Sequence, residues 1–155
     1  MYKTILFDWG NTLMIDYPDQ KGPMYKWEKV KSVKNSKKTL SYLYKKYNCC
    51  LATNAKDSTK DDISRALKRV KINKFIKDIY CFKEIGFEKP SNEYFSKIIR
   101  DNNCKEYLMI GDNPEIDITG AQKYGIDGIL FDPENRYNNF KGKKITDLAD
   151  LIRIL

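Results

Sequence analysis

The sequence predicts an α/β fold: a doubly wound, Rossmann-like parallel sheet of about five strands with helices on both faces. Short apolar runs alternate along the chain with segments whose apolar residues recur at helical spacing. Most of the runs are continuously apolar, as expected for strands that are buried on both faces. With 155 residues, 41% of them hydrophobic and 32% charged, residues 1–155 are expected to form a single core domain.

Five apolar runs have the length and composition of strands. They are short and rich in branched or aromatic residues, and polar or glycine-containing segments bound them. Several end in an aspartate or an asparagine, which places polar groups at the carboxyl end of a strand. The predicted strands cover residues 3–8, 48–54, 78–82, 106–112 and 127–132.

Helical segments separate these strands. Apolar residues at positions 40, 43, 44 and 47 form one stripe, which indicates a helix over 36–47. Ser58 is the predicted N-cap of the next helix, Pro90 precedes the third, and Gly125 ends the fourth as a C-cap. The predicted helices cover residues 36–47, 58–70, 91–102, 115–125 and 146–155.

Residues 15–35 show neither pattern. The segment contains two prolines, a glycine and several large aromatic side chains. We expect a small flap or loop insertion after the first strand rather than a separate domain. Tyr17, Tyr25 and Trp27 are candidate substrate contacts, and the alternative is that these aromatics pack the flap onto the body of the domain.

The chain contains no histidine, which excludes Ser-His-Asp and Cys-His catalysis and zinc sites that use imidazole. An enzyme of this composition would use carboxylates and lysine, together with a metal that prefers oxygen ligands. The net charge of +8 favours an anionic ligand such as a phosphate. Because the basic residues are scattered along the chain, a solvated surface explains them as well, and nucleic acid is an alternative partner.

No apolar run reaches the roughly 18 residues that a membrane-spanning helix needs, so no membrane partner is expected. The N-terminal apolar stretch is short and is interrupted by Asp8, unlike a signal peptide, and we expect a cytoplasmic protein. The four cysteines form no CxxC pair, so we expect reduced, mostly buried thiols rather than a zinc or redox site.

Polar residues follow the predicted strands at their carboxyl ends, where a doubly wound sheet binds ligands. Aspartates at two strand ends offer oxygen ligands to Mg²⁺, and a carboxylate can also attack phosphorus to form an acyl phosphate. A threonine can bind phosphate oxygens, and a lysine can neutralise both nucleophile and phosphate. Taken singly, each residue is ordinary turn or capping chemistry, so the argument depends on the whole set. The set comprises Asp8, Thr53, Asn54, Lys89, Asp112, Asn113 and Asp117.

Four short motifs carry a specific resemblance. They are ILFDWGNTL at 5–13, LATN at 51–54, GFEKP at 86–90 and IGDNPEID at 110–117. In this order they resemble the haloacid dehalogenase-like (HAD) superfamily, whose members are mostly Mg²⁺-dependent phosphatases. The resemblance extends from Lys3 to about Pro133, nearly the whole chain.

The resemblance implies a role for each matching residue. Asp8 would be the nucleophile and a metal ligand, Lys89 would bridge Asp8 and the phosphate, and Asp112 would be the second metal carboxylate. The carbonyl of Gly10 would be a further metal ligand, and Thr53 and Asn54 would bind the substrate. Asp117 would support the site by holding metal-bound water or by orienting Lys89, and Asn113 would also support it.

The first motif departs from the family at Gly10, where phosphatases usually carry a second aspartate that protonates the leaving group. Such an acid typically contributes about 10²–10⁴-fold in rate. Without it, substrates with a good leaving group are favoured, or another carboxylate such as Asp16 or Asp19 must supply the proton. The short spacing between Asp8 and Thr53 leaves no room for a full helical cap, which indicates a minimal-cap member with an open site.

The leading interpretation is therefore a Mg²⁺-dependent HAD-like hydrolase, a phosphatase that forms an aspartyl phosphate. Its substrate would be a phosphorylated small molecule or a phosphorylated macromolecule. The alternative is a catalytically impaired HAD-fold module that binds a phosphorylated ligand or a protein partner. A dehalogenase also lacks the second aspartate, but Asp112 favours a retained metal site.

Overall fold

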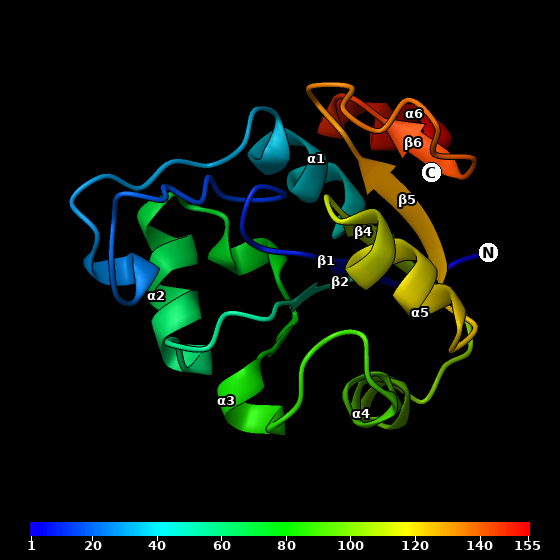
Figure 1. Cartoon of the computed structure of the whole chain (residues 1–155), viewed down its shortest axis with the longest axis horizontal. Helices are drawn as coiled ribbons and strands as arrows, with labels where there is room; N and C mark the ends of the chain where they lie inside the picture. The colour runs from blue at the N-terminus through cyan, green and yellow to red at the C-terminus, as the bar shows by residue number, and fades with distance from the viewer.

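The computed structural model describes residues 1–155 as a parallel sheet with helices on both faces (Figure 1). The strand order is β3-β2-β1-β4-β5-β6, and all neighbouring strands are parallel. This architecture confirms the predicted fold class. The strands are β1 Thr4–Phe7, β2 Asn48–Ala52, β3 Asp78–Tyr80, β4 Tyr107–Gly111, β5 Asp127–Phe131 and β6 Lys143–Ile145.

The sixth strand, β6, was not predicted from the sequence. It is three residues long, two of them lysines, and only Ile145 is buried. It extends the sheet because it pairs with β5, and the N–H of Asp132 donates to the carbonyl of Ile145 at 2.8 Å. A short, charged edge strand has no apolar run by which to recognise it.

Five of the six helices lie in predicted helical segments, and several of them are shorter than predicted. The six helices are α1 Ser36–Leu43, α2 Lys60–Arg69, α3 Phe82–Ile85, α4 Asn92–Asn102, α5 Gly120–Gln122 and α6 Leu151–Ile154. Helix α3 was not predicted, and the strand predicted over 78–82 was wrong at its end, because β3 stops at Tyr80 and Phe82 begins α3. The predicted helix over 115–125 is a wide π-helical turn, Pro114–Thr119, followed by α5. The predicted helix over 146–155 is a 3-10 turn, Leu148–Asp150, that continues into α6. Gly125 ends its segment with φ of +75°, as a C-cap glycine does.

The N-cap of α2 is Thr59, and the expectation that Ser58 would cap it was wrong. The Thr59 hydroxyl accepts from the N–H of Asp62 at 3.1 Å, and the N–H of Thr59 donates to the Asp62 carboxylate at 2.9 Å. This reciprocal pair is a capping box. Ser58 is instead buried, and its hydroxyl donates to Asp57.

Two hydrophobic layers enclose the sheet. Alternate residues of the central strand β1 point to opposite faces, so Ile5 and Phe7 belong to one layer and Leu6 to the other. The larger layer is covered by α1, α2 and α6, and the smaller layer by α4 and α5. Burial on both faces explains why β1, β2 and β4 are continuously apolar.

Residues 15–35, referred to below as the flap, lie between β1 and α1 and pack against α2 (Figure 1). Its one short helix is the 3-10 turn Met24–Lys26. Arg69 of α2 donates from its guanidinium to the carbonyls of Tyr25, at 3.1 Å, and Glu28, at 3.3 Å. Within the flap, the Trp27 indole N–H donates to the carbonyls of Lys21 and Gly22.

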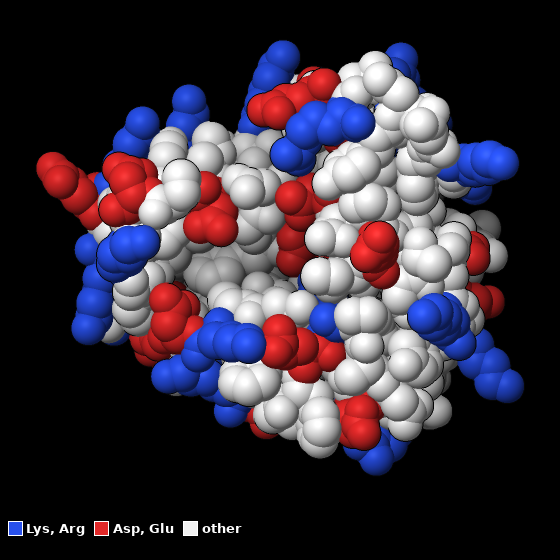
Figure 2. All heavy atoms as spheres, in the orientation of Figure 1, with Lys and Arg blue, Asp and Glu red and all other residues white.

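The four cysteines are free thiols, and three of them are buried, as expected. None of the helices has both the length and the apolar character needed to cross a membrane. Lysines and arginines lie mostly around the outline of the face in Figure 2, whereas acidic side chains surround the hollow near its centre. On this face the positive charge is therefore not concentrated at the hollow.

The capping box predicts the effect of a surface substitution. Thr59→Ala removes the acceptor for the Asp62 N–H, and we expect the free energy of unfolding to fall by about 1 kcal/mol. Thr59→Ser keeps the hydroxyl and should stay close to the wild type in urea denaturation. An equal loss in both variants would contradict the assigned cap.

Candidate active site

The site lies beyond the carboxyl end of β1, the strand that β2 and β4 flank. Asp8 follows β1, Thr53 follows β2 and Asp112 follows β4, so parallel pairing brings all three to one edge. The N–H of Asp8 donates to the carbonyl of Ile110 at 2.9 Å, which ties the residue to β4. The chain leaves β1 toward β2 and β3 and later returns to β4 on its other side, and such a switch point opens a crevice.

Lys89 is the buried cation of the site, with only 4% of the residue exposed. Its ammonium donates to Asp8 Oδ1 at 3.0 Å, to Asp117 Oδ1 at 2.7 Å and to the carbonyl of Ala52 at 2.7 Å. An ammonium has three N–H donors, and each has a partner here. Lys89 therefore links the ends of β1 and β2 to the turn that follows β4.

The backbone of Lys89 is held by Asn54. The Asn54 amide donates to the Lys89 carbonyl at 2.9 Å, and its Oδ1 accepts from the Lys89 N–H at 2.7 Å. This two-point contact fixes the loop that carries the ammonium. It explains Asn54 without a substrate, and the predicted contact between Asn54 and a substrate stays a prediction.

Asp117 is 2% exposed and sits directly against Gly111. A Cβ atom at position 111 would lie 2.2 Å from Asp117 Oδ2, which is far inside van der Waals contact. Asp117 Oδ2 also accepts from the N–H of Asn113 at 3.1 Å. The Asn113 side chain caps the turn, since its Oδ1 accepts from the N–H groups of Glu115 and Ile116, and so it shapes the backbone around Asp117.

Burial and the charge of Lys89 determine the pKa shifts of the carboxylates in the site. Burial raises the pKa of Asp8, and the ammonium of Lys89 opposes that shift. Burial likewise raises the pKa of Asp112 and of Asp117. Burial alone would lower the pKa of Lys89, but the carboxylates of Asp117 and Asp8 outweigh it, so the pKa of Lys89 is raised and the side chain is a cation.

Three carboxylates converge at this edge and fit the requirements of a hard divalent cation. Oxygen atoms of Asp8, Asp112 and Asp117 lie within 4.8 Å of one another. The carbonyl of Gly10 accepts no hydrogen bond from the protein, and its predicted role as a metal ligand stays a prediction. Oxygen donors of this kind suit Mg²⁺.

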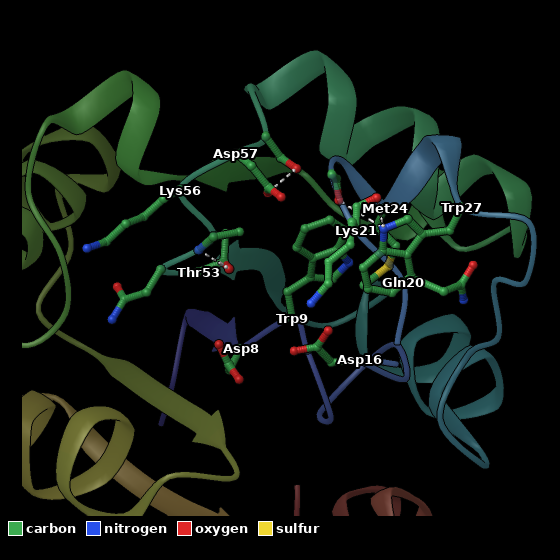
Figure 3. Close-up of a pocket in the computed structure, with 15 residues that line it drawn as sticks. Asp8, Trp9, Asp16, Gln20, Lys21, Met24, Trp27, Thr53, Lys56 and Asp57 are labelled. Carbon is green, nitrogen blue, oxygen red and sulfur yellow. Dashed lines mark hydrogen bonds between the residues drawn. The ribbon is translucent and has the colours of Figure 1, made fainter. Parts of the chain in front are cut away.

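A pocket of about 560 Å³ opens between the strand ends and the flap. Asp8 and Thr53 line it on the sheet side, and Gln20, Lys21 and Trp27 line it on the flap side (Figure 3). The Thr53 residue is 4% exposed, and its hydroxyl accepts from the N–H of Ala55 at 3.1 Å. The pocket thus places a threonine and a carboxylate at one wall and a flap at the other.

The three aromatic residues of the flap were expected either to contact the substrate or to pack the flap onto the domain. Trp27 lines the pocket while also packing into the core. Tyr17 and Tyr25 are not among the pocket residues. The Lys29 ammonium lies 4.7 Å from the centre of the Tyr17 ring, and the Arg65 guanidinium lies 4.1 Å from that of Tyr25. These two rings serve packing.

Several contributions to the site were not predicted from the sequence. The Thr12 hydroxyl donates to Asp8 Oδ2 at 3.3 Å, and the carbonyl of Ala52 accepts from Lys89. A hydroxyl four residues after Asp8, inside the first motif, was the available signal for Thr12. The close approach of Gly111 to Asp117 had no signal other than the glycine itself.

The order of the sheet and the carboxylates beyond its central strands define a Rossmann-like α/β domain with a polar site at its carboxyl edge. The sequence model of the family described as haloacid dehalogenase-like hydrolase matches residues 10–131. This match covers most of the chain, and the chain therefore belongs to the haloacid dehalogenase-like hydrolase family.

Two curated relatives match over most of the chain. YfnB of Bacillus subtilis, which its name assigns to the HAD-hydrolases, is 27% identical over 124 residues, 74% of this chain and 52% of YfnB. A ribulose-1,5-bisphosphate 5-phosphatase of Halopiger xanaduensis is 29% identical over 109 residues, 68% of this chain and 44% of the relative. The chain thus spans about half the length of these relatives or less.

Solved structures share the fold at low sequence identity. The structure of YfnB from Bacillus subtilis, bound to magnesium, superposes with a TM-score of 0.80 and 19% identity, over 99% of this chain and 98% of that one. A 2-haloacid dehalogenase from Pseudomonas syringae superposes with a TM-score of 0.79 and 15% identity, over 99% and 98% of the two chains. At these identities the likeness concerns the fold alone.

The contact between Gly111 and Asp117 predicts a large effect for one methyl group. Gly111→Ala should displace the Asp117 carboxylate and lower the free energy of unfolding by roughly 1–3 kcal/mol, the usual cost of overpacking. Gly10→Ala is the comparison variant and should cost less, because its Cβ would meet only the exposed side chain of Asp16, at 3.3 Å. Urea denaturation of both variants checks this, and equal stabilities would contradict the packing argument.

Proposed function

We propose that the chain is a Mg²⁺-dependent phosphatase that acts through an aspartyl phosphate on Asp8. The observation that carries the proposal is the position of Lys89, whose ammonium bonds Asp8 and Asp117 at the edge where Asp112 also lies. Phosphoryl transfer depends mainly on positioning and charge neutralisation, and this arrangement supplies both.

Asp8 is the nucleophile in this proposal. One of its oxygens is bonded to Lys89 at 3.0 Å, while the other has the longer 3.3 Å contact with Thr12. The second oxygen is therefore the one free to attack phosphorus. Lys89 orients the carboxylate and neutralises charge on the phosphate, and the pocket position of Thr53 suits phosphate binding.

Asp8, Asp112 and the Gly10 carbonyl would hold Mg²⁺, with Asp117 and Asn113 in support. A bound Mg²⁺ would neutralise the charge of the phosphate and of the crowded carboxylates. Asp117 in this arrangement acts on Lys89, to which it is bonded at 2.7 Å. Its other oxygen is held by the N–H of Asn113, so the carboxylate keeps a fixed orientation.

The flap 15–35 is the specificity element of this proposal, and the domain is a minimal-cap member of its family. Gln20, Lys21 and Trp27 face the phosphate-binding wall across an open pocket. An open pocket accommodates a phosphorylated small molecule or the exposed phosphate of a macromolecule. The phosphatase named among the relatives acts on a phosphorylated sugar, which suits the same class of substrate.

A second candidate is a module that binds a phosphorylated ligand or a protein partner without turning it over. The observation that favours it is Gly10, which carries no carboxylate to protonate a leaving group. The two candidates differ in one measurable property, since only the phosphatase hydrolyses nitrophenyl phosphate in a Mg²⁺-dependent manner. A dehalogenase reaction is disfavoured by the acidic cluster, which suits a cation.

Asp8→Asn tests the nucleophile. An amide cannot form the acyl phosphate, so we expect Mg²⁺-dependent hydrolysis of nitrophenyl phosphate to fall roughly 10⁴-fold or more. Asp101→Asn is the control, because that carboxylate pairs only with Lys97 on the surface of α4. Circular dichroism should show both variants folded, and retained activity in Asp8→Asn would refute the proposed mechanism.

Asp112→Asn tests the metal site separately from turnover. Replacing a charged oxygen ligand by an amide should weaken Mg²⁺ binding by roughly 10-fold or more, measured by titration calorimetry without substrate. Asp101→Asn again serves as the control and should bind Mg²⁺ like the wild type. Identical affinities for Asp112→Asn and the wild type would remove Asp112 from the site.

A further inference from the structure

Another side chain fills the space that Gly10 leaves beside Asp8. A Cβ atom built on Gly10 would lie 3.3 Å from the Cβ of Asp16, 3.5 Å from its Oδ2 and 3.7 Å from its Cγ. The Asp16 side chain, including its carboxyl group, therefore lies directly beside the place that a Cβ at position 10 would occupy. That position is where the resemblance to phosphatases leads one to expect a carboxylate.

The turn after β1 brings Asp16 back to Gly10. Asn11 adopts a left-handed conformation, with φ of 58°, which asparagine tolerates better than most residues. Its Oδ1 accepts from the N–H of Asp16 at 3.0 Å, and the N–H of Ile15 donates to the carbonyl of Lys31 at 2.9 Å. Hydrogen bonds therefore fix the backbone at Asp16 and at the residue before it.

The carboxylate of Asp16 is free to react. It accepts no hydrogen bond from the protein, it lines the same pocket as Asp8, and it points toward Asp8 in Figure 3. Asp57 also lines this pocket, but its carboxylate accepts the hydroxyl of the buried Ser58 at 3.1 Å. Asp16 and Asp19, the two acids at the start of the flap, are both exposed, but only Asp16 is among the pocket residues.

We propose that Asp16 is the general acid and base of the reaction, taking the place of the carboxylate that Gly10 lacks. This assignment rests on the proposed phosphatase function. It also accounts for glycine at position 10, because a larger side chain there would compete with Asp16 for the same space.

The proposed chemistry proceeds in two steps. Asp8 attacks phosphorus, the bond from phosphorus to the leaving oxygen breaks, and that oxygen keeps the electron pair and takes the proton of Asp16. The products are an alcohol, the Asp8 acyl phosphate and the Asp16 carboxylate. In the second step the oxygen of a water molecule attacks phosphorus while Asp16 takes a proton from that water. The bond between phosphorus and Asp8 breaks, its electron pair returns to the Asp8 carboxylate, orthophosphate leaves, and Asp16 is protonated again.

The test compares two leaving groups in Asp16→Asn. An alkoxide cannot leave unprotonated, whereas nitrophenolate can, so kcat/KM for an alkyl phosphate should fall by roughly 10²–10⁴-fold while that for nitrophenyl phosphate changes little. Both kcat values should fall, because hydrolysis of the acyl phosphate is common to both substrates. Rapid mixing with nitrophenyl phosphate should then show a burst of nitrophenol equal to the enzyme concentration.

Two further variants make the comparison specific. Asp19→Asn removes the same charge from the same flap outside the pocket, and both substrates should behave as with the wild type. Gly10→Asp combined with Asp16→Ala moves the carboxylate to position 10. Position 10 has no positive φ, and Asp16→Ala removes the carboxyl group that lies beside it, so alkyl phosphate hydrolysis should recover relative to Asp16→Asn.

The possible outcomes separate this assignment from the proposed function. An equal change in kcat/KM for both substrates in Asp16→Asn overturns the role of Asp16 while leaving the phosphatase intact. So does a result that matches Asp19→Asn. A wild-type protein that hydrolyses neither substrate with Mg²⁺ overturns both. A selective loss on the alkyl phosphate together with a burst supports the assignment.

Discussion

The buried ammonium of Lys89 is the interaction on which the rest of the site depends. A charge taken out of water is costly unless it is paired and fully hydrogen-bonded, and Lys89 meets both conditions through Asp8, Asp117 and the Ala52 carbonyl. Its partners come from three separate parts of the chain, so the ammonium joins them. The requirement also explains neighbouring residues: Gly111 makes room for Asp117, and Asn54 fixes the backbone of Lys89.

Much of the fold was predictable because buried parallel strands have a clear signature in the sequence. The segments around β1, β2 and β4 are continuously apolar, and each proved to be buried on both faces. Edge strand β6 escaped prediction because two of its three residues are lysines. The turn Pro114–Thr119 is π-helical where an α-helix was predicted, because the spacing of apolar residues over so short a segment does not distinguish the two.

The candidate site was predictable to the extent that it follows from topology. Parallel strands bring their carboxyl ends to one edge, so residues such as Asp8, Thr53 and Asp112 had to be neighbours once the strands were recognised. The contacts between side chains were not predictable in this way. Whether Asn54 would turn toward Lys89, or Asp16 toward Gly10, depends on loop conformations that no spacing in the sequence specifies.

The central claim is that Asp8 is phosphorylated and that Lys89 holds it ready for attack. The most direct measurement starts the reaction with Mg²⁺ and nitrophenyl phosphate and quenches it during turnover. The acyl phosphate is then reduced with borohydride, and the product is mapped by peptide mass spectrometry. The account predicts that Asp8 alone is converted to homoserine, and only when substrate is present. A phosphorylated or reduced residue elsewhere, or an unmodified Asp8 in a protein that turns substrate over, would contradict it.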